Sequence, residues 1–213
     1  MALPNGIEST EELLAAQAHV WNHMSSLINS MSLKCAIQLC IPDIIHKHNK
    51  PITLSQLIHS LPINKANSTC LARLMRILIH SKFFINVKIS NDEEEEEEAY
   101  WLTPASRLLL RDEPLSIAPL ALAMLDPVLV DPWHHVSEWF QNDRASPFVT
   151  KHGRLELIDQ RNKFNEGMDS DARFVSSVVI KECRQVFDGL KSMVDVGGGI
   201  GTVARAITEA FPA

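Results

Sequence analysis

A glycine-rich turn between a short apolar segment and a helical segment constrains the fold more than any other feature of the chain. Residues 193–202 read Met-Val-Asp-Val-Gly-Gly-Gly-Ile-Gly-Thr. Residues 193–196 are typical of a buried strand, and residues 202–211 predict a helix. The glycines can take backbone angles that residues with a Cβ avoid, so the chain can turn sharply beside a ligand. Because the free N–H groups of the helix point at the same place, the turn predicts a site for a polar or anionic ligand.

Two ligand classes compete for such a turn. Residues 199–204 satisfy the loose G-x-G-x-x-A fingerprint of dinucleotide-binding folds, but the first glycine is Gly197, and counting from it puts Thr202 where Gly or Ala is needed. A pyrophosphate would also be repelled by Asp195, whereas a cofactor with an amino-acid group, such as S-adenosylmethionine, would not. The turn favours S-adenosylmethionine, and a tight strand-to-helix turn without any ligand remains the alternative.

Composition and charge limit the classes of protein to which the chain can belong. The chain has 213 residues, 46% of them hydrophobic, and a formal net charge of −6, so it can bury a core and has no general attraction for nucleic acid or anionic lipid. Its four cysteines lack paired C-x-x-C spacing, which favours reduced thiols. Adjacent His134 and His135 face different directions on a helix, so no metal site is expected. The acidic N-terminus argues against a signal peptide, and a soluble cytoplasmic protein is expected.

The N-terminal half predicts a helical module with a small hairpin. Helical apolar spacing covers residues 10–31 and 33–46, and further helices are expected over 51–62 and 69–81. Two β-favouring runs around a polar loop, 83–89 and 99–103, predict a hairpin. Helix, helix, hairpin is the order of a winged-helix module. The long apolar faces of the first 50 residues indicate that part of this surface is buried against a second copy of the chain.

An acidic tract in the hairpin loop bears on whether this module binds DNA. Residues 92–98 are seven consecutive acids, where a DNA-binding wing would carry Lys or Arg. Because these acids would repel phosphates, the module is predicted to be an assembly element. The tract itself is expected to be a solvated, disordered loop tip.

The second half of the chain predicts helices up to the glycine turn. From residue 104 to about residue 131 the expected helices are interrupted at Pro114, Pro119 and Pro127. A helix-spaced segment follows at 131–140, and a longer helix is expected over 162–179. That helix leads into the turn.

Six motifs that run from one end of the chain to the other carry a family resemblance. They are the segment 36–45, Leu-Ala-Arg-Leu-Met-Arg-Ile-Leu at 71–78, Leu-Thr-Pro-Ala-Ser at 102–106, Pro-Trp-His-His at 132–135, Phe-Asn-Glu-Gly-Met at 164–168, and the segment 189–201 with Phe-Pro behind it at 211–212. Together they resemble the plant small-molecule O-methyltransferases of the caffeate, isoflavone and stilbene type, which use S-adenosylmethionine. The resemblance implies a mainly α fold, with a winged-helix-like dimerisation domain over residues 1–120. Connecting helices and the first β-α unit of an α/β doubly wound class I methyltransferase domain would follow over 121–213.

The resemblance also implies where the cofactor binds. In relatives the first glycine of the turn contacts S-adenosylmethionine, which carries over to Gly197. Asp195, Gly199 and Gly201 line the same turn and are expected to belong to the cofactor site. No metal ligand is expected at this site.

The acceptor pocket is implied in the same way. Aromatic and methionine side chains on the helix before the turn line it in relatives, which carries over to Phe164 and Met168. The segment before Pro132 contributes as well, so Met124 and Leu129 are further candidates. By their spacing alone these four residues are equally typical of a helix core.

Two departures from the family pattern bear on activity. Only ten residues, 154–163, separate His152-Gly153 from Phe164, where relatives carry a longer segment with aromatic residues. The carboxylate that holds the cofactor ribose, roughly 20 residues after the turn in comparable folds, and the general-base histidine are expected beyond Ala213. The chain is therefore expected to be a C-terminally truncated O-methyltransferase of an isoflavonoid, stilbene or phenylpropanoid hydroxyl, with no catalytic residue of its own and no activity alone. The alternative is a non-enzymatic partner that forms dimers with full-length relatives through residues 10–120, and either a homodimer or a heterodimer is expected.

Overall fold

The computed structural model describes residues 6, 9–90, 96–153 and 161–212. It begins with α1, a single helix of 29 residues over Thr10–Gln38. The Ser9 side chain caps it by accepting a hydrogen bond from the Glu12 amide at 3.0 Å, and acids in the first turn suit the positive end of the helix dipole. The predicted division into two helices near residue 32 is wrong, because nothing in the sequence interrupts the backbone there.

The break in the first helical region lies at Leu39 and Cys40 instead. Cys40 has a left-handed φ of 56° and precedes α2 (Ile41–His48), so it does not lie inside a helix as predicted. Pro42 explains the position of the break, since a proline is accommodated in the first turn of a helix but not in its interior. The same reasoning applies to α5 (Pro104–Arg107), α6 (Ala118–Met124), α7 (Pro127–Val130), η2 (Asp131–His135) and α9 (Pro147–His152), each of which has a proline at its first or second position.

A three-stranded antiparallel sheet with the order β1-β3-β2 lies against the N-terminal helices. The predicted hairpin is present as β2 (Phe84–Ser90) and β3 (Glu96–Leu102), with Phe84 opposite Leu102. The strand β1 (Ile52–Thr53) was not predicted, because two residues are too short to show a period of two. Glu96, Glu97 and Glu98 lie in β3 and not in the loop, whereas the rest of the acidic tract, 92–95, lies outside the described residues.

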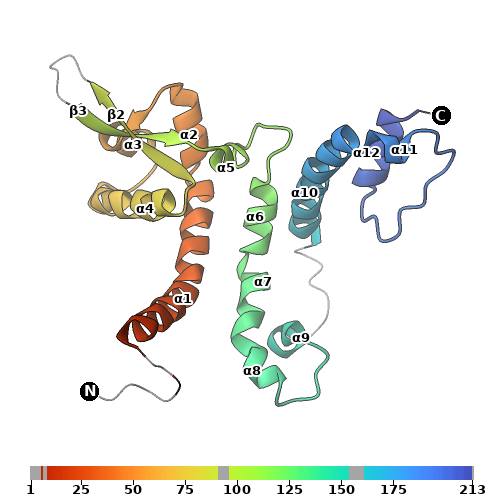
Figure 1. Cartoon of the computed structure of the whole chain (residues 1–213), viewed down its shortest axis with the longest axis horizontal. Coiled ribbons are helices and arrows are strands. Elements are labelled where there is room, and N and C mark those ends of the chain that lie inside the picture. Colours follow the sequence, from red (N-terminus) through yellow and green to blue (C-terminus); the bar gives the residue numbers. More distant parts are fainter. Residues whose placement is uncertain (1–5, 7–8, 91–95, 154–160, 213) are drawn as a thin grey trace.

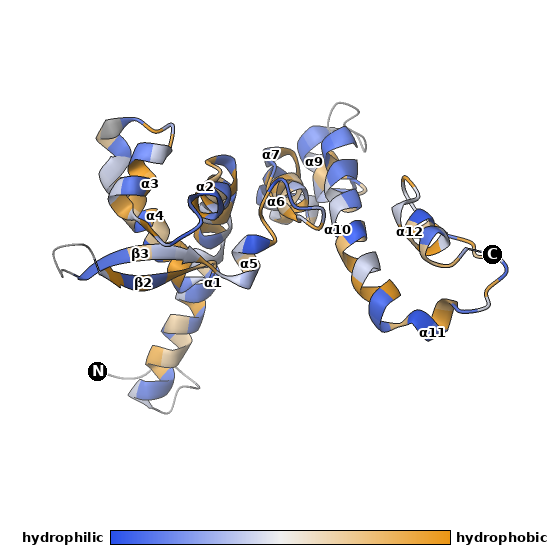
Figure 2. Ribbon diagram, turned by 90° about the horizontal axis from the view of Figure 1, so that it is seen from above, coloured by the Kyte–Doolittle hydropathy of each residue, from blue (hydrophilic) through white to orange (hydrophobic). Residues whose placement is uncertain are grey.

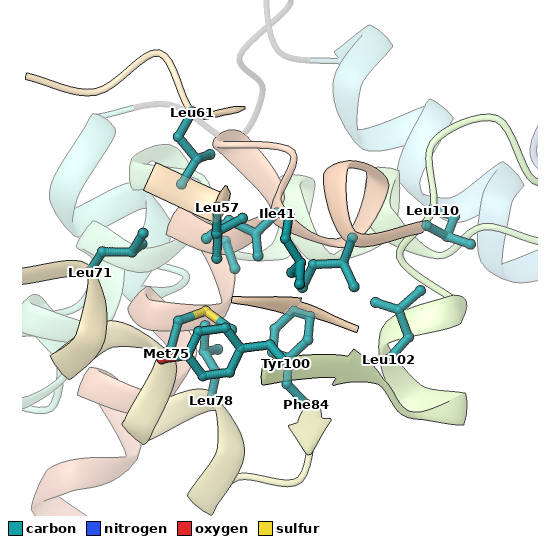
Figure 3. Close-up of a cluster of buried hydrophobic side chains, with 13 residues drawn as sticks. Ile41, Leu57, Leu61, Leu71, Met75, Leu78, Phe84, Tyr100, Leu102 and Leu110 are labelled. Atoms are coloured by element: carbon teal, nitrogen blue, oxygen red, sulfur yellow. The ribbon is translucent and has the colours of Figure 1, made fainter. Parts of the chain in front are cut away.

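Two helices pack over this sheet and close the main core. They are α3 (Leu54–Ser60), which begins with a capping box between Thr53 and Gln56, and α4 (Ser68–His80), which follows the 3₁₀ turn η1 (Lys65–Asn67). Figure 3 shows apolar side chains converging from α2, α3, α4 and the strands. The buried members are Ala36, Ile41, Ile45, Ile52, Leu57, Leu61, Leu71, Met75, Leu78, Phe84, Tyr100, Leu102 and Leu110. The helix–helix–hairpin order expected from the sequence is therefore built around one apolar cluster.

The second half of the chain extends away from this module (Figure 1). Helices α6, α7, η2, α8 (Val136–Trp139) and α9 lead to α10 (Arg161–Glu182), which packs against α6 and α12 (Thr202–Ala210). The short helix α11 (Arg184–Phe187) joins α10 to the glycine turn. The predicted domain boundary at residues 120 and 121 falls within α6 and stays a prediction. No helix of the described residues is both long enough and apolar enough to span a membrane.

The predicted strand at residues 193–196 is not formed. Val194 is 85% exposed and Val196 is 92% exposed, and neither is assigned to a strand. A strand needs a neighbour to pair its backbone N–H and C=O groups, and the described strands all belong to the sheet of the N-terminal module. The sequence pattern identified a segment suited to a sheet interior, but the pairing partner that would bury it is absent from the described structure.

Candidate cofactor and acceptor site

The glycine turn adopts backbone angles that explain its composition. Gly197, Gly199 and Gly201 have φ values of 77°, 56° and 80°, in the left-handed region that costs other residues about 1 kcal/mol or more. A Cβ atom at any of the three would have no heavy atom within 4 Å, so the backbone conformation and not crowding requires glycine there. The Gly201 amide donates to the Gly198 carbonyl at 2.8 Å and closes the turn directly before α12.

Asp195 lies over the middle of this turn. A Cβ atom on Gly198 would come within 2.2 Å of Asp195 Oδ2, so the carboxylate occupies the space that any larger residue at 198 would need. The Asp195 residue is exposed to solvent. The structure thus brings the four predicted cofactor residues together in one loop, with a carboxylate available to a cationic group.

The start of α12 adds hydrogen-bond donors to the same loop. No side chain caps its N-terminus, where Gly201 occupies the N-cap position. The first N–H groups of a helix have no partner within the helix, and they carry the positive end of its dipole. A carboxylate on one side of the turn and free N–H groups on the other suit a ligand with both an ammonium and a carboxylate group.

The predicted acceptor residues lie on three neighbouring helices. Phe164 and Met168 are on α10, and Met124 ends α6; all three are between 41% and 44% exposed. Leu129 is half-buried on α7, which contacts α6 and η2. The structure therefore places Phe164, Met168 and Met124 on two helices that touch, while Leu129 lies one helix further on.

Gly167 allows α6 and α10 to approach closely. A Cβ atom at this position would lie 2.9 Å from Ala123 Cβ and 3.2 Å from Leu120 Cα. Gly167 sits between Phe164 and Met168 in the family motif at 164–168, and its sequence context alone indicates no role for it. Its lack of a side chain sets the spacing of the helices that carry the acceptor candidates.

The sequence did not single out Asp169, which connects α10 to the first residue of α12, directly after the glycine turn. The hydroxyl of Thr202, the first residue of α12, donates a hydrogen bond to Asp169 Oδ1, and Arg173 pairs with the other carboxylate oxygen. The i, i+4 spacing of Asp169 and Arg173 was a visible signal. No local sequence pattern indicates the hydrogen bond between Asp169 and Thr202, because these residues are far apart in the chain.

Two histidines in the second half of the chain, His135 and His152, contact groups away from the glycine turn. His135 Nδ1 lies 2.9 Å from Glu138 Oε2, and His152 Nε2 lies 3.0 Å from the Val128 carbonyl with its ring against Phe148. Within the described ranges, no group of three or more His, Cys, Asp and Glu side chains converges as a metal site. The acceptor-wall segment predicted to be shortened includes residues 154–160, which lie outside the described residues.

A separate cavity of about 620 Å³ lies between α1, α6 and α10. Its polar lining includes Lys34, Arg111, Asp126, Lys163 and Glu166, and its apolar lining comes from α6 and the start of α7. None of the eight predicted site residues lines it. The cavity is therefore distinct from the loop and helix faces described above.

Known proteins match the chain along most of its length. The O-methyltransferase dimerisation domain matches residues 21–112, and the O-methyltransferase domain matches residues 133–213. The 8-hydroxyquercetin 8-O-methyltransferase of Mentha piperita is 63% identical, over 100% of this chain and 61% of that protein. The trans-resveratrol di-O-methyltransferase of Vitis vinifera is 56% identical, over 100% of this chain and 60% of that protein. The chain thus spans about 60% of the length of these relatives.

Solved structures show the same fold at low sequence identity. Human N-acetylserotonin methyltransferase in complex with SAM aligns with a TM-score of 0.66 at 16% identity, covering 99% of this chain and 59% of that one. The pyocyanin biosynthetic protein PhzM aligns with a TM-score of 0.67 at 20% identity, covering 93% and 56%. A dimerisation domain followed by a methyltransferase domain agrees with the fold class expected from the sequence. With both domain families matched and plant relatives at 56% to 63% identity, the chain belongs to the plant O-methyltransferase family.

Proposed function

We propose that this chain supplies the dimerisation module, the acceptor helices and the first cofactor turn of an S-adenosylmethionine-dependent O-methyltransferase that acts on a phenolic small molecule. The observation that carries the proposal is the turn at 197–201, with its three left-handed glycines next to Asp195 and the uncapped start of α12. The O-methyltransferase domain match over the same residues supports it. A relative of this fold has been solved with SAM bound.

The residues of the turn fit the amino-acid end of S-adenosylmethionine. Asp195 would accept from the ammonium group, and the N–H groups at the start of α12 would donate to the carboxylate. Gly197 and Gly199 would let the backbone approach the cofactor closely. When bound, the cofactor supplies an electrophilic methyl group on its sulfonium. The contribution of these residues is to hold and orient, which is a large part of the rate in a displacement between two positioned reactants.

The exposed apolar residues on α6 and α10 fit an aromatic acceptor. A methionine thioether makes favourable contacts with aromatic rings, and Phe164 can stack against one. The two plant relatives named above are methyltransferases of 8-hydroxyquercetin and trans-resveratrol, and a further relative, 51% identical over 96% of this chain, is the eugenol O-methyltransferase of Ocimum basilicum. We propose that Phe164, Met168, Met124 and Leu129 bind a ring of this class and that its hydroxyl is the methyl acceptor.

A second function is favoured by the surface of α1. The half of this helix that extends beyond the sheet carries apolar residues along its length (Figures 1 and 2). Each is at least 50% exposed: Leu14, Val20, Trp21, Met24, Leu27 and Ile28. Burying a large apolar side chain contributes about 1.5–3 kcal/mol, so six of them can offset the entropy cost of association. We propose that this α1 face binds a second copy of the chain or a related methyltransferase, so that the chain can act as a non-enzymatic partner.

The charge of the chain bears on its cellular location and on the partners that it binds. We propose a cytoplasmic protein, and its net charge of −6 supports the view that it binds neither nucleic acid nor anionic membranes. The acids of β3 support the same view, since Glu96 and Glu98 pair with Lys88 and Asn86 across the hairpin and leave no basic wing there.

Calorimetric titration of the purified chain with S-adenosylhomocysteine tests the cofactor site, and radiolabelled methyl transfer to a flavonol, a stilbene and eugenol tests the enzyme. Cofactor binding without turnover is the expected result for the chain alone, and turnover would contradict the predicted inactivity. Sedimentation of the wild type and of Met24→Glu tests the α1 face, with Asn22→Glu, an exposed position on the opposite side of the same helix, as the matched control. A wild-type chain that sediments as a monomer at all concentrations would exclude the partner function.

A further inference from the structure

One polar contact joins the two helices that carry the two halves of the candidate site. Thr202 donates its hydroxyl hydrogen bond to Oδ1 of Asp169, 33 positions earlier in the chain. The other carboxylate oxygen of Asp169 pairs with Nη1 of Arg173, one turn further along α10. Both oxygens of Asp169 are therefore engaged, and its side chain is only 18% exposed.

The contact lies at the junction of the acceptor face and the cofactor turn. Asp169 directly follows Met168 on α10, and Thr202 directly follows Gly201, the last glycine of the turn. Because the Gly201 amide is bonded to the Gly198 carbonyl at 2.8 Å, whatever holds Thr202 in place also holds the end of the turn. One side chain from each helix thus connects the two binding surfaces.

The charge of Asp169 suits this location. A carboxylate near the N-terminus of α12 interacts favourably with the positive end of the helix dipole. Hydrogen bonds to an ionised acceptor are roughly twice as strong as neutral ones. Arg173 pairs with the Asp169 carboxylate. Removing the Thr202 hydroxyl would therefore loosen the orientation of α12 without leaving an unpaired buried charge.

We propose that Asp169 is a positioning residue for methyl transfer, which acts through Thr202 to fix the 197–201 turn against α10. By this contact the cofactor turn and the acceptor face of α10 keep one spacing and one orientation. The inference rests on the proposed function for its catalytic meaning, whereas the ordering of the turn by Asp169 can be measured without any ligand. In-line transfer is sensitive to the placement of its two reactants, so this spacing matters to the reaction.

A simpler explanation is that Asp169 only forms an i, i+4 ion pair within α10. Such pairs on exposed helices contribute little to stability. This explanation predicts that removing Arg173 has the same effect as removing Asp169, and that Thr202 has no effect of its own. The two explanations are therefore separated by variants at three positions.

The experiment is a double-mutant cycle with Asp169→Ala, Thr202→Val and the double variant, together with Asp169→Asn and Arg173→Gln. The first measurement is amide hydrogen exchange over residues 198–206 without ligand. Asp169→Ala and Thr202→Val are each expected to speed exchange roughly tenfold, the loss of one strong hydrogen bond. The double variant is expected to go no further. Asp169→Asn, which keeps an acceptor for Thr202, is expected to restore most of the protection, and Arg173→Gln is expected to stay near wild type.

The second measurement is the affinity for S-adenosylhomocysteine, with the thermal unfolding midpoint of each variant as the control for folding. Affinity is expected to fall in Asp169→Ala and Thr202→Val by a similar factor while the midpoint stays near wild type. Three outcomes would each overturn the proposal. They are additive effects in the double variant, an Arg173→Gln effect as large as that of Asp169→Ala, and Asp169→Ala and Thr202→Val variants that bind S-adenosylhomocysteine as tightly as a wild type with measurable affinity. A wild-type chain without measurable affinity would instead overturn the cofactor assignment, and the exchange data would still decide whether Asp169 orders the turn.

Discussion

The Nζ atom of Lys34 donates a hydrogen bond of 2.6 Å to the backbone carbonyl of Leu125. Leu125 is the C-cap residue of α6, whose last carbonyls have no partner within the helix. A cation at the C-terminal end of a helix is also favoured by the dipole. This one side chain therefore connects the long N-terminal helix to the C-terminal end of α6, where the acceptor candidate Met124 lies.

Replacing Lys34 with methionine is expected to destabilise the chain by about 1–2 kcal/mol, because the Leu125 carbonyl loses its charged donor. Urea unfolding followed by circular dichroism measures the change. Lys47→Met, at an exposed position of α2, is the matched control and should stay within about 0.5 kcal/mol of wild type. Equal stability of Lys34→Met and wild type would show that the contact contributes nothing.

Gly167→Val is expected to force α6 and α10 apart. The added Cβ would meet Ala123 Cβ at 2.9 Å, and overpacking of this kind costs about 1–3 kcal/mol even though valine is the better helix former. Asn165→Val on the same helix controls for β-branching. Adding Ala123→Gly to Gly167→Val should recover part of the stability, and failure to do so would mean that the close contact is not the cause.

Local signals in the sequence predicted most of the elements that the structure contains. A proline fixes the start of α5, α6 and α7, and a capping box fixes the start of α3, because these effects operate within four or five residues. The hairpin at 84–102 followed from two β-favouring runs around a polar loop. The backbone angles of the 197–201 turn followed from its glycines for the same reason.

The features that were missed depend on distant partners. The strand β1 is defined only by its pairing with Tyr100 and Ala99 on β3. Residues 193–196 do not form a strand, because no segment of the described structure pairs with them. The bond between Asp169 and Thr202 joins two helices across the turn. None of these could be read from local spacing, since each depends on which segments the fold brings together.

Alanine substitutions at neighbouring glycines of the turn should weaken cofactor binding for different reasons. Gly197→Ala imposes a left-handed φ of 77° on a residue with a Cβ, which should reduce affinity for S-adenosylhomocysteine roughly five- to tenfold. Gly198→Ala instead displaces the Asp195 carboxylate, 2.2 Å from the new Cβ. In an Asp195→Ala background the effect of Gly198→Ala should largely vanish, whereas that of Gly197→Ala should remain. Titration calorimetry on the three single variants and the two double variants measures these effects. If both glycine effects persist equally in the Asp195→Ala background, the role proposed for Asp195 is contradicted.

Tyr100, the one tyrosine of the chain, is 9% exposed in the core of the N-terminal module. Burial raises the pKa of its phenol above the usual value of 10.0, the Glu98 carboxylate raises it further, and Arg76 opposes them. Because the folded state holds the proton more tightly than the unfolded state, this stabilisation is fully present below pH 10.0 and is lost as the pH rises through the folded pKa.

Tyr100→Phe should therefore remove part of the alkaline loss of stability seen in the wild type, and Glu98→Gln should bring the tyrosine pKa closer to its usual value. The tyrosinate absorbance band reports the titration without interference from a second tyrosine, and urea unfolding at a series of pH values reports the stability. Lysine and cysteine titrations are common to all three proteins, so the difference between them isolates Tyr100. A wild-type tyrosine that titrates at its usual pKa would show that burial of the phenol does not couple to the stability of this module.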